Sequence, residues 1–555
     1  MSNKFILRKN DRVVFLGDSI TEQHLYTNYV ESYLATRYPE LNLTFFNAGW
    51  GGDRAPGGAQ RLERDVLSLK PTVVTICYGM NDGSYIRPTP EILKAFTDGM
   101  KELIARLKRA RIRIVLLTPG FADTSVNPNL KLVDYNAQCL RRLADAVLGL
   151  AAKEKLPVFD IHKLMTSVDR KAKKAIKGFT MAPDGFHPSP AGHVVMAYGL
   201  LKALGVPPWS RQITVDLAKG SVRSVPGVKV TGPTPLDGGF SLKLSLDRLP
   251  FFVEPDARKV LPFVPFQETF NDLSLRLVGH KAAAYYFRME LERSLPYTRA
   301  QLGRGINLFS IFGMPAVLRA QAIHNFTNEK CQVYFKLWRG LAMGGSNTDY
   351  EPALHRVAIR NMPLLDRVRG RLAAATPKPV VLRLYASEGT GEHVADGDFI
   401  STWSFLGPFP KPFGRDHLKG EAAFSASVPL KPVGWKAGEL EIRTPGDNLS
   451  RIFGARVNAL GYAVTVLDSP VEQAAQLLVG SDDGFAAWLN GEPLASRLEL
   501  KRGVVADEDA LPVRLRKGKN VLLFKISQDV GSWGFCARFR GLKQVLIADR
   551  PKVSK

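Results

Sequence analysis

The sequence predicts an α/β domain at its N-terminus, in which helices cover both faces of a parallel sheet. Between residues 12 and 205, five short apolar runs alternate with segments that have the apolar spacing of helices. This alternation is typical of a parallel sheet. The first run, at residues 13–16, stops at Gly17 and is followed by Asp18 and Ser19. A short run of Val, Phe and Leu that ends at glycine indicates a strand buried on both faces.

The remaining elements of this domain follow in a regular order. We expect strands at residues 13–17, 41–46, 72–78, 112–118 and 157–161. We expect helices at residues 22–37, 58–69, 89–109, 131–153 and 189–204. Ligands of open α/β sheets bind outside the carboxyl ends of the strands, so the residues just after each strand are the candidates for chemistry.

Polar and glycine-rich segments occupy those positions. Ser19 follows the first strand, Gly52 the second and Asn81 the third. A fourth segment, with Asp184 and His187, lies in a loop constrained by Pro and Gly just before the last helix. These segments should therefore meet at one edge of the sheet.

The four segments resemble the four sequence blocks of the SGNH (GDSL-type) hydrolases. They read GDS at residues 17–19, NxGxxG at 47–52, GxND at 79–82 and DxxH at 184–187, in the order and spacing of that family. The resemblance covers roughly the first 205 residues. It implies a flavodoxin-like five-stranded sheet and a serine hydrolase that needs no metal and no organic cofactor.

The residue types fit this chemistry. A serine hydroxyl becomes a nucleophile when a base takes its proton, so Ser19 would be activated by His187, which Asp184 would orient. The backbone N–H groups of Ser19 and Gly52 and the side-chain amide of Asn81 would stabilise the oxyanion. Without the other blocks, Asn81 would be interpreted as a turn former and His187 as an ordinary loop histidine.

Other interpretations of the neighbouring residues stay open. Gly51 is adjacent to Gly52 and is an alternative backbone donor. Asp18 is a candidate to contact the substrate or to brace the loop. Trp50 and Tyr78 are candidates to line an acyl or sugar pocket or to pack in the core. We expect the catalytic domain, which contains Ser19 and the other candidate site residues, to cover residues 1–206.

Beyond residue 206 the pattern changes to short alternating segments separated by Gly and Pro. We expect strands at residues 212–217, 227–231, 240–246, 271–279 and 285–291, and helices at 315–341 and, strongly basic, around 364–375. The hypothesis is a β-rich and helical annex over residues 207–378 that packs on the catalytic domain and has a structural role, with a lesser chance that it shapes the rim of the site.

We expect a β-sandwich of the jelly-roll type over residues 398–555, because the pattern there indicates many short strands with Asn-Gly turns between them. The words SDDG at 481–484 and WLNG at 488–491 resemble modules of bacterial carbohydrate-active proteins, which implies sugar binding. Asp482 and Asp483 would also suit calcium. Acidic turn residues that bond to their own backbone are the more common case, so no metal is expected.

Composition sets further bounds. The formal net charge is +24 at pH 7, but Lys and Arg are spread along the chain without a nucleic-acid signature, so a solvated basic surface is expected and nucleic acid is not. The four cysteines form no CxxC pair, which favours buried free thiols. No stretch is long enough to span a bilayer. No signal peptide is visible, so the protein is cytoplasmic unless a leader for secretion or the periplasm was removed.

The function we predict is that of a serine esterase acting on short-chain carboxylic esters. The resemblance and the appended sandwich favour O-acetyl groups on carbohydrates, so the substrate would be a small-molecule or polysaccharide ester. A lipase or thioesterase of the same fold is one alternative, and a non-catalytic glycan-binding protein is the other. Nothing in the sequence predicts the oligomeric state.

Overall fold

The structure is a computed structural model that describes residues 4–236, 239–289, 292–293, 297–310, 314–343, 350–374, 379–387, 392–394, 397–400, 402–426, 436–439, 448–454, 456–542 and 545–547. The chain divides into two compact units. The first unit consists of Met1–Thr234, Leu242–Gly279 and Gly303–Leu382, and the second of Pro235–Ser241, His280–Leu302 and Arg383–Lys555. We describe each unit by itself.

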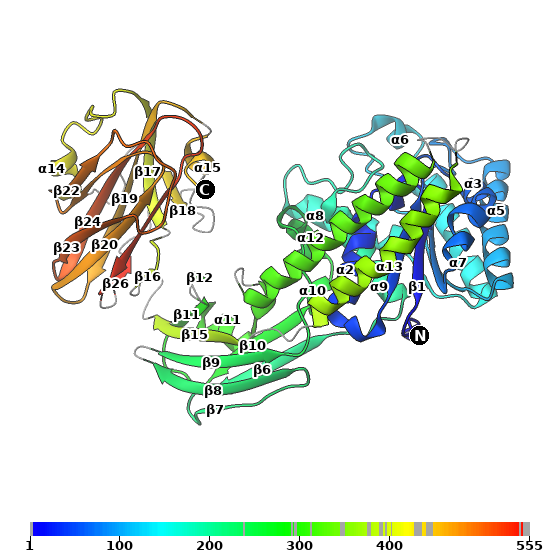
Figure 1. The fold of residues 1–555 in the computed structure, drawn as a ribbon, viewed down its shortest axis with the longest axis horizontal. Coiled ribbons are helices and arrows are strands. Elements are labelled where there is room, and N and C mark those ends of the chain that lie inside the picture. Colours follow the sequence, from blue (N-terminus) through cyan, green and yellow to red (C-terminus); the bar gives the residue numbers. More distant parts are fainter. Residues whose placement is uncertain are drawn as a thin grey trace. The chain divides into compact units, whose positions relative to one another are not determined.

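A five-stranded parallel sheet forms the centre of the first unit (Figure 1). Its strands are β1 (Arg12–Gly17), β2 (Thr44–Gly49), β3 (Val73–Cys77), β4 (Arg113–Leu117) and β5 (Val158–Phe159), in the order β2-β1-β3-β4-β5. This is the flavodoxin-like order, which confirms the predicted fold class. Gly17 lies opposite both Gly49 and Cys77, so the neighbouring strands β2, β1 and β3 end at the same level.

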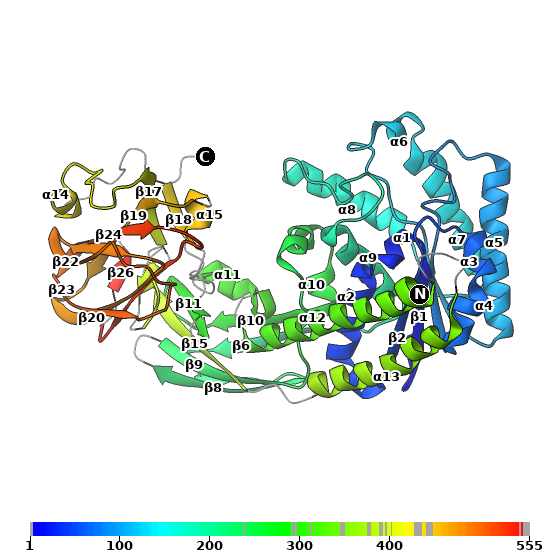
Figure 2. The same cartoon turned by 45° about the horizontal axis from the view of Figure 1, so that its top comes forward.

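Helices cover both faces of this sheet, as predicted. On one side α2, α8 and α9 pack together, and on the other α3, α5 and α7 do so (Figure 2). Their bounds, with the short helical turns between them, are α1 (Ser19–Glu22), α2 (Leu25–Arg37), η1 (Pro39–Leu41), α3 (Ala55–Gln60), α4 (Leu62–Asp65), η2 (Leu67–Leu69), α5 (Pro90–Arg109), α6 (Pro128–Leu132), η3 (Asn136–Leu140), α7 (Arg141–Glu154), α8 (Ile161–Ala175) and α9 (Pro190–Ala203).

Three helical predictions needed correction, and one helix was missed. The helix expected at residues 58–69 is divided into three short segments, α3, α4 and η2. The helix expected at residues 22–37 is interrupted at His24, whose φ of 65° lies in the left-handed region. The helix expected at 131–153 is interrupted at Asp134, with φ of 45°, and continues through the π-helical turn η3 into α7. Helix α8 was not predicted, although its buried apolar residues 161, 165, 168 and 172 have helical spacing.

The first unit continues through a four-stranded sheet and two long helices. The sheet has the order β14-β10-β6-β7. Helices α12 and α13 pack on α2 and on β2 of the five-stranded sheet and lie side by side in both views (Figures 1 and 2). The bounds are β6 (Ser210–Asp216), β7 (Ser221–Val222), β8 (Val228–Leu236), β9 (Gly239–Leu246), η4 (Pro255–Phe263), α10 (Phe266–Phe270), β10 (Asp272–Val278), β14 (Ile306–Asn307), η5 (Leu308–Ser310), α12 (Pro315–Phe335), η6 (Lys336–Ala342) and α13 (Pro352–Ala374).

A buried charge cluster joins these two helices to α2. Glu31 of α2 accepts hydrogen bonds from Lys330 of α12 and Arg369 of α13. Asp366 accepts from Lys330 at 2.8 Å and from Arg369 at 2.8 Å. All four residues are 5% exposed or less. Burial alone would raise the pKa of Glu31, but the two cations outweigh it and hold the pKa below its usual value.

The second unit contains a β-sandwich, as predicted. A sheet in the order β16-β26-β19-β24-β21-β22, to which β17 and β18 add, faces a three-stranded sheet in the order β23-β20-β25. Buried residues of both sheets share one core around Trp403, Phe524 and Phe535. The bounds are β16 (Glu392–Val394), β17 (Thr402–Pro410), α14 (Glu421–Ala426), β18 (Lys436–Glu439), α15 (Ser450–Phe453), β19 (Ala459–Ser469), β20 (Gln473–Ser481), β21 (Phe485–Leu489), β22 (Glu492–Arg497), β23 (Asp509–Leu515), β24 (Gly518–Gln528), β25 (Phe535–Arg540) and β26 (Val545–Ile547).

Further short elements precede the sandwich. Strand β11 pairs antiparallel with β12, β13 and β15. Their bounds, with the adjoining helix, are β11 (Ala284–Met289), β12 (Glu292–Arg293), β13 (Tyr297–Thr298), α11 (Arg299–Arg304) and β15 (Val380–Ser387).

The structure also bears on the cysteines and on the acidic turn. All four cysteines are buried free thiols, as expected. Asp482 accepts a hydrogen bond from the Ser532 hydroxyl at 2.6 Å, and Asp483 accepts from the backbone N–H of Asp529 at 2.5 Å. No cluster of three or more His, Cys, Asp or Glu side chains suited to a metal occurs within the described ranges. In the same ranges, no helix is both long and apolar enough to cross a bilayer.

Candidate active site

The candidate nucleophile stands at the turn between β1 and α1. Asp18 is the N-cap of α1, and its carboxylate accepts a hydrogen bond from the backbone N–H of Ile20 at 3.0 Å. Burial, with Asp82 nearby, raises the pKa of Asp18 to about 8. At Gly17 an added Cβ would lie 2.2 Å from Thr21 Oγ1, so only glycine lets the strand turn this closely into the helix. Asp18 therefore braces the turn that presents Ser19.

Ser19, His187 and Asp184 form a chain of hydrogen bonds. Ser19 Oγ lies 2.9 Å from His187 Nε2, and His187 Nδ1 lies 2.7 Å from Asp184 Oδ2. The other carboxylate oxygen of Asp184 accepts from the backbone N–H groups of Phe186 at 2.9 Å and His187 at 2.8 Å. Burial raises the pKa of Asp184, but these hydrogen bonds outweigh it and hold the pKa below its usual value. An ionised carboxylate thus faces the imidazole.

The loop that carries Asp184 and His187 is held by residues that the sequence analysis did not single out. Asp123, which follows β4, donates its backbone N–H to the Gly185 carbonyl at 2.9 Å. Its carboxylate accepts from Lys173 of α8 at 2.6 Å and from Thr180 at 2.7 Å. Ser189 occupies the N-cap position of α9, but its hydroxyl makes no capping hydrogen bond.

The glycine-rich loop after β2 packs against the helix that begins at Ser19. Asn47 donates to the Thr21 carbonyl at 2.7 Å and accepts from the backbone N–H of Gly49 at 2.8 Å. A Cβ on Gly49 would lie 2.2 Å from the backbone nitrogen of Glu22, so the two segments are in close contact. Gly52 has φ of +72°, a conformation that favours glycine. Its surroundings are open, with no atom within 4 Å of an added Cβ.

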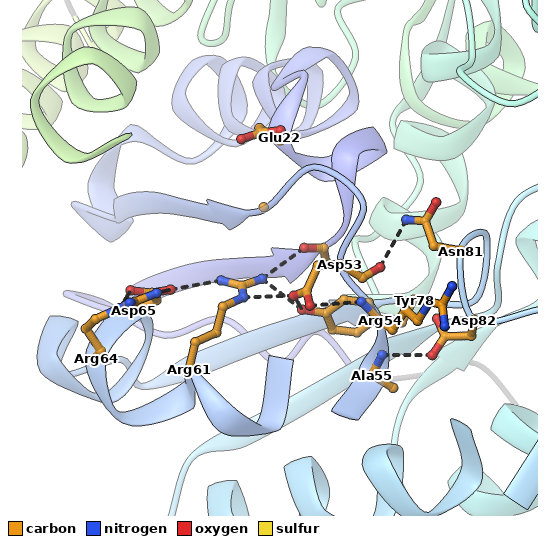
Figure 3. A network of polar contacts seen from close by, with 12 residues as sticks. Glu22, Asp53, Arg54, Ala55, Arg61, Arg64, Asp65, Tyr78, Asn81 and Asp82 are labelled. Atoms are coloured by element: carbon orange, nitrogen blue, oxygen red, sulfur yellow. Dashed lines mark hydrogen bonds and ion pairs between the residues drawn. The ribbon is translucent and has the colours of Figure 1, made fainter. Parts of the chain in front are cut away.

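Asn81 is fixed beside this loop. Its Nδ2 donates to the backbone carbonyl of Asp53 at 3.0 Å (Figure 3). Its Oδ1 accepts from the Tyr85 hydroxyl at 2.5 Å. An amide nitrogen carries two hydrogens, so one N–H of Asn81 is left for an oxyanion. Asn81, Gly52 and Ser19 each follow the end of one of three neighbouring strands that stop at the same level.

A network of polar side chains contacts the glycine-rich loop that follows β2. Figure 3 shows Asp53 between Arg61 and Asn81. The Asp53 carboxylate accepts from Arg61 Nε at 2.8 Å, from the Tyr78 hydroxyl at 2.7 Å and from the backbone N–H of Arg54 at 2.9 Å. Arg61 also donates to the Tyr78 oxygen at 2.8 Å. The Tyr78 side chain is fully buried, so it supports the loop from behind.

Trp50 lies between the hydrolase domain and the annex. The Arg339 guanidinium lies 3.4 Å from the centre of the Trp50 ring, and Trp338 meets the same ring edge-on at 6.1 Å. Arg339 Nε donates to Glu22 at 2.9 Å. Both annex residues come from η6, a π-helical segment, a rare conformation that is frequent at functional sites. The sequence analysis missed Arg339 because no local pattern links it to residue 50.

Comparison with known proteins agrees with this geometry. Residues 15–195 match the sequence model of the GDSL-like lipase/acylhydrolase family. The N-terminal domain is similar to this family. An acetylxylan esterase of Geobacillus stearothermophilus is 24% identical over 217 residues, which are 35% of this chain and 94% of that protein.

One solved structure shares the fold over most of this chain. A gut microbial diltiazem-metabolizing enzyme is 20% identical with a TM-score of 0.57, over 70% of this chain and 99% of its own. An α/β hydrolase from the metagenome of Lake Arreo, Spain, is 22% identical with a TM-score of 0.30, over 37% of this chain and 98% of its own. The coverage of 70% means that the fold shared with the first of these extends beyond the GDSL-like domain.

Proposed function

We propose that the GDSL-like domain is a serine esterase that hydrolyses short-chain carboxylic esters through an acyl-enzyme on Ser19. The observation that carries this proposal is the hydrogen-bonded chain from Ser19 through His187 to Asp184. His187 Nε2 takes the Ser19 proton while Oγ attacks the carbonyl carbon. The same proton then passes to the departing alcohol, and Asp184 keeps the imidazole oriented and stabilises its cation.

The second half of the reaction uses the same groups. Water attacks the acyl carbon, gives one proton to His187, and releases the carboxylic acid as the proton returns to Ser19. In both steps the negative charge on the carbonyl oxygen is stabilised by the backbone N–H groups of Ser19 and Gly52 and by the remaining N–H of Asn81. Gly51 is the alternative backbone donor, since it is adjacent and also exposed.

For the substrate we propose O-acetyl groups on carbohydrates. The acetylxylan esterase relative supports this class. The site itself also supports a short acyl group on a large alcohol: the side chains of His187 and Asp184 are 37% and 51% exposed, and Gly51 and Gly52 lie at the surface. An open site of this kind leaves a bulky sugar outside the protein. In the sandwich, Trp403 and Trp533 are fully buried, so neither of these two rings can stack on a sugar.

The direct test is covalent labelling of the full chain with a fluorophosphonate probe, which reacts with activated serines. We expect labelling of the wild type, none of Ser19→Ala, and undiminished labelling of Ser68→Ala, a matched change at an exposed serine. Folded wild type that takes no label would refute the proposal and favour a non-catalytic glycan-binding protein.

A further inference from the structure

The outer face of α13 carries two rows of side chains that the hydrolase fold does not use. The buried row, which packs the helix onto the first unit, consists of His355, Ala358, Met362, Asp366, Arg369 and Ala373. One exposed row is aliphatic, with side chains 38% to 53% exposed: Leu354, Val357, Leu364, Val368 and Leu372. The other exposed row is basic: Arg356, Arg360, Arg367 and Arg371.

The two exposed rows run parallel along the helix. At 3.6 residues per turn, the aliphatic row spans about 80° of the helix circumference and the arginine row the next 60° or so. Each row extends over most of a helix of 23 residues, roughly 35 Å long. Asn361 is exposed within the aliphatic row, between Val357 and Leu364. Large aliphatic side chains are exposed singly on ordinary surfaces, whereas five along one helix face mark a surface that has a partner.

Helix α12 extends the apolar surface. It runs beside α13, since Lys330 pairs with Asp366 and Arg319 donates to the Leu372 carbonyl at 2.8 Å (Figures 1 and 2). Leu318, next to Arg319 in sequence, is 46% exposed, and Val333 is 44% exposed. Glu329 and Asn325 are exposed on the same face of α12, so the apolar surface is chiefly that of α13.

The exposed charged side chains of this surface are mostly positive. The acidic residues of α12 and α13 are Glu329, which is exposed, and Asp366, which is buried in the charge cluster. In the parts of the chain that the structure describes, none of the four exposed arginines of α13 has a carboxylate within 4.0 Å. Four cations are thus available to an anionic partner.

We propose that the α12–α13 face binds an anionic lipid surface. Helix α13 would lie in the plane of the headgroups, with its aliphatic row at the acyl boundary and its arginine row on the lipid phosphates. A second copy of the chain would place each arginine row against a face whose one exposed carboxylate is Glu329. A soluble polyanion would pair with the arginines but leave the aliphatic row in water.

The test is co-flotation of the full chain with phosphatidylcholine vesicles that contain, or lack, phosphatidylglycerol. We expect binding to the anionic vesicles alone, and weaker binding at high salt. Arg360→Gln/Arg367→Gln should lower the partition by more than tenfold, since each arginine near an anionic surface contributes roughly fivefold. Leu364→Gln/Val368→Gln should do the same without a change in charge. Far-UV circular dichroism and thermal melting check that both variants fold.

The matched control removes two exposed arginines elsewhere in the first unit, Arg109 of α5 and Arg142 of α7, by Arg109→Gln/Arg142→Gln. It should bind like the wild type. Wild type that does not float with anionic vesicles at low salt would overturn the proposal. So would a control that loses as much binding as the α13 arginine variant. If Leu364→Gln/Val368→Gln instead turns a dimer into a monomer, the partner is a second copy and the proposal fails.

Discussion

Replacing Arg339 by glutamine tests how far the annex supports the proposed oxyanion loop. The Arg339 guanidinium stacks 3.4 Å from the Trp50 ring centre, and its Nε pairs with Glu22 at 2.9 Å. A partly desolvated cation–π contact contributes about 1–2 kcal/mol. A hydrogen bond between charged groups contributes about 1.5–3 kcal/mol. Because Trp50 directly precedes Gly51 and Gly52, losing both contacts should loosen the loop that carries the backbone donor.

The size of the effect follows from how else the loop is held. The side chains of Arg339 and Glu22 are 16% and 18% exposed, so solvent screens their interaction only in part. Removing an oxyanion donor outright costs on the order of 10² to 10³ in kcat. The loop in this variant keeps its contacts through Asn47 and Asp53. We therefore expect Arg339→Gln to lower kcat roughly tenfold, or about 1.4 kcal/mol, with little change in KM.

The assay is steady-state hydrolysis of p-nitrophenyl acetate by the full chain. Lys336→Gln removes an exposed cation from the same π-helical segment and should leave kcat unchanged. Arg339→Lys keeps the charge but loses the planar stacking, so its kcat should lie between those of the wild type and Arg339→Gln. If Arg339→Gln retains the kcat of Lys336→Gln, or changes KM alone, the positioning role is wrong.

Three further predictions concern single side chains. Asn81→Ala should lower kcat by about 10² to 10³, and an unchanged kcat would remove Asn81 from the oxyanion site. Burial raises the pKa of Asp82 from its ordinary 3.8 to about 7. The folded protein then holds a proton that the unfolded chain releases, so the free energy of unfolding should fall by up to about 1.4 kcal/mol per unit as pH rises from about 4 to about 7. Asp82→Asn should flatten that slope in urea titrations at several pH values, and an unchanged slope would contradict the assignment. Lys330→Met leaves buried carboxylates with one cation fewer and should lower the free energy of unfolding by about 3–5 kcal/mol, whereas a loss below about 1 kcal/mol would show that the cluster is not stabilising.

The sequence predicted the parts of the molecule whose signal is local. A few consecutive residues are enough to indicate each of the five apolar strands, the turn at Ser19 and the glycine loop at Gly52. The order of the strands in the sheet then brings the ends of β1 and β2 to the same level. The ionised partner of His187 lies only three residues away, so Asp184 could be named without a structure. The family resemblance then assigned roles to these residues.

The rest depends on contacts between distant segments. Asp123 and Lys173 hold the loop that carries His187, but they meet only because α8 follows β5, and that helix was missed. Arg339 reaches Glu22 from 317 positions away in the sequence. The interruption of a helix at His24 cannot be predicted from the sequence, because histidine does not require the left-handed conformation that it adopts there.

The central claim is that Ser19 carries an acyl group from a short ester. The measurement that tests it most directly compares wild type with Ser19→Ala on p-nitrophenyl acetate, p-nitrophenyl octanoate and acetylated xylan. Serine-dependent release of acetate from the first and the last, with little octanoate turnover, is the predicted result. Preference for octanoate would indicate a lipase or thioesterase. Acetate release that persists in folded Ser19→Ala would contradict the mechanism.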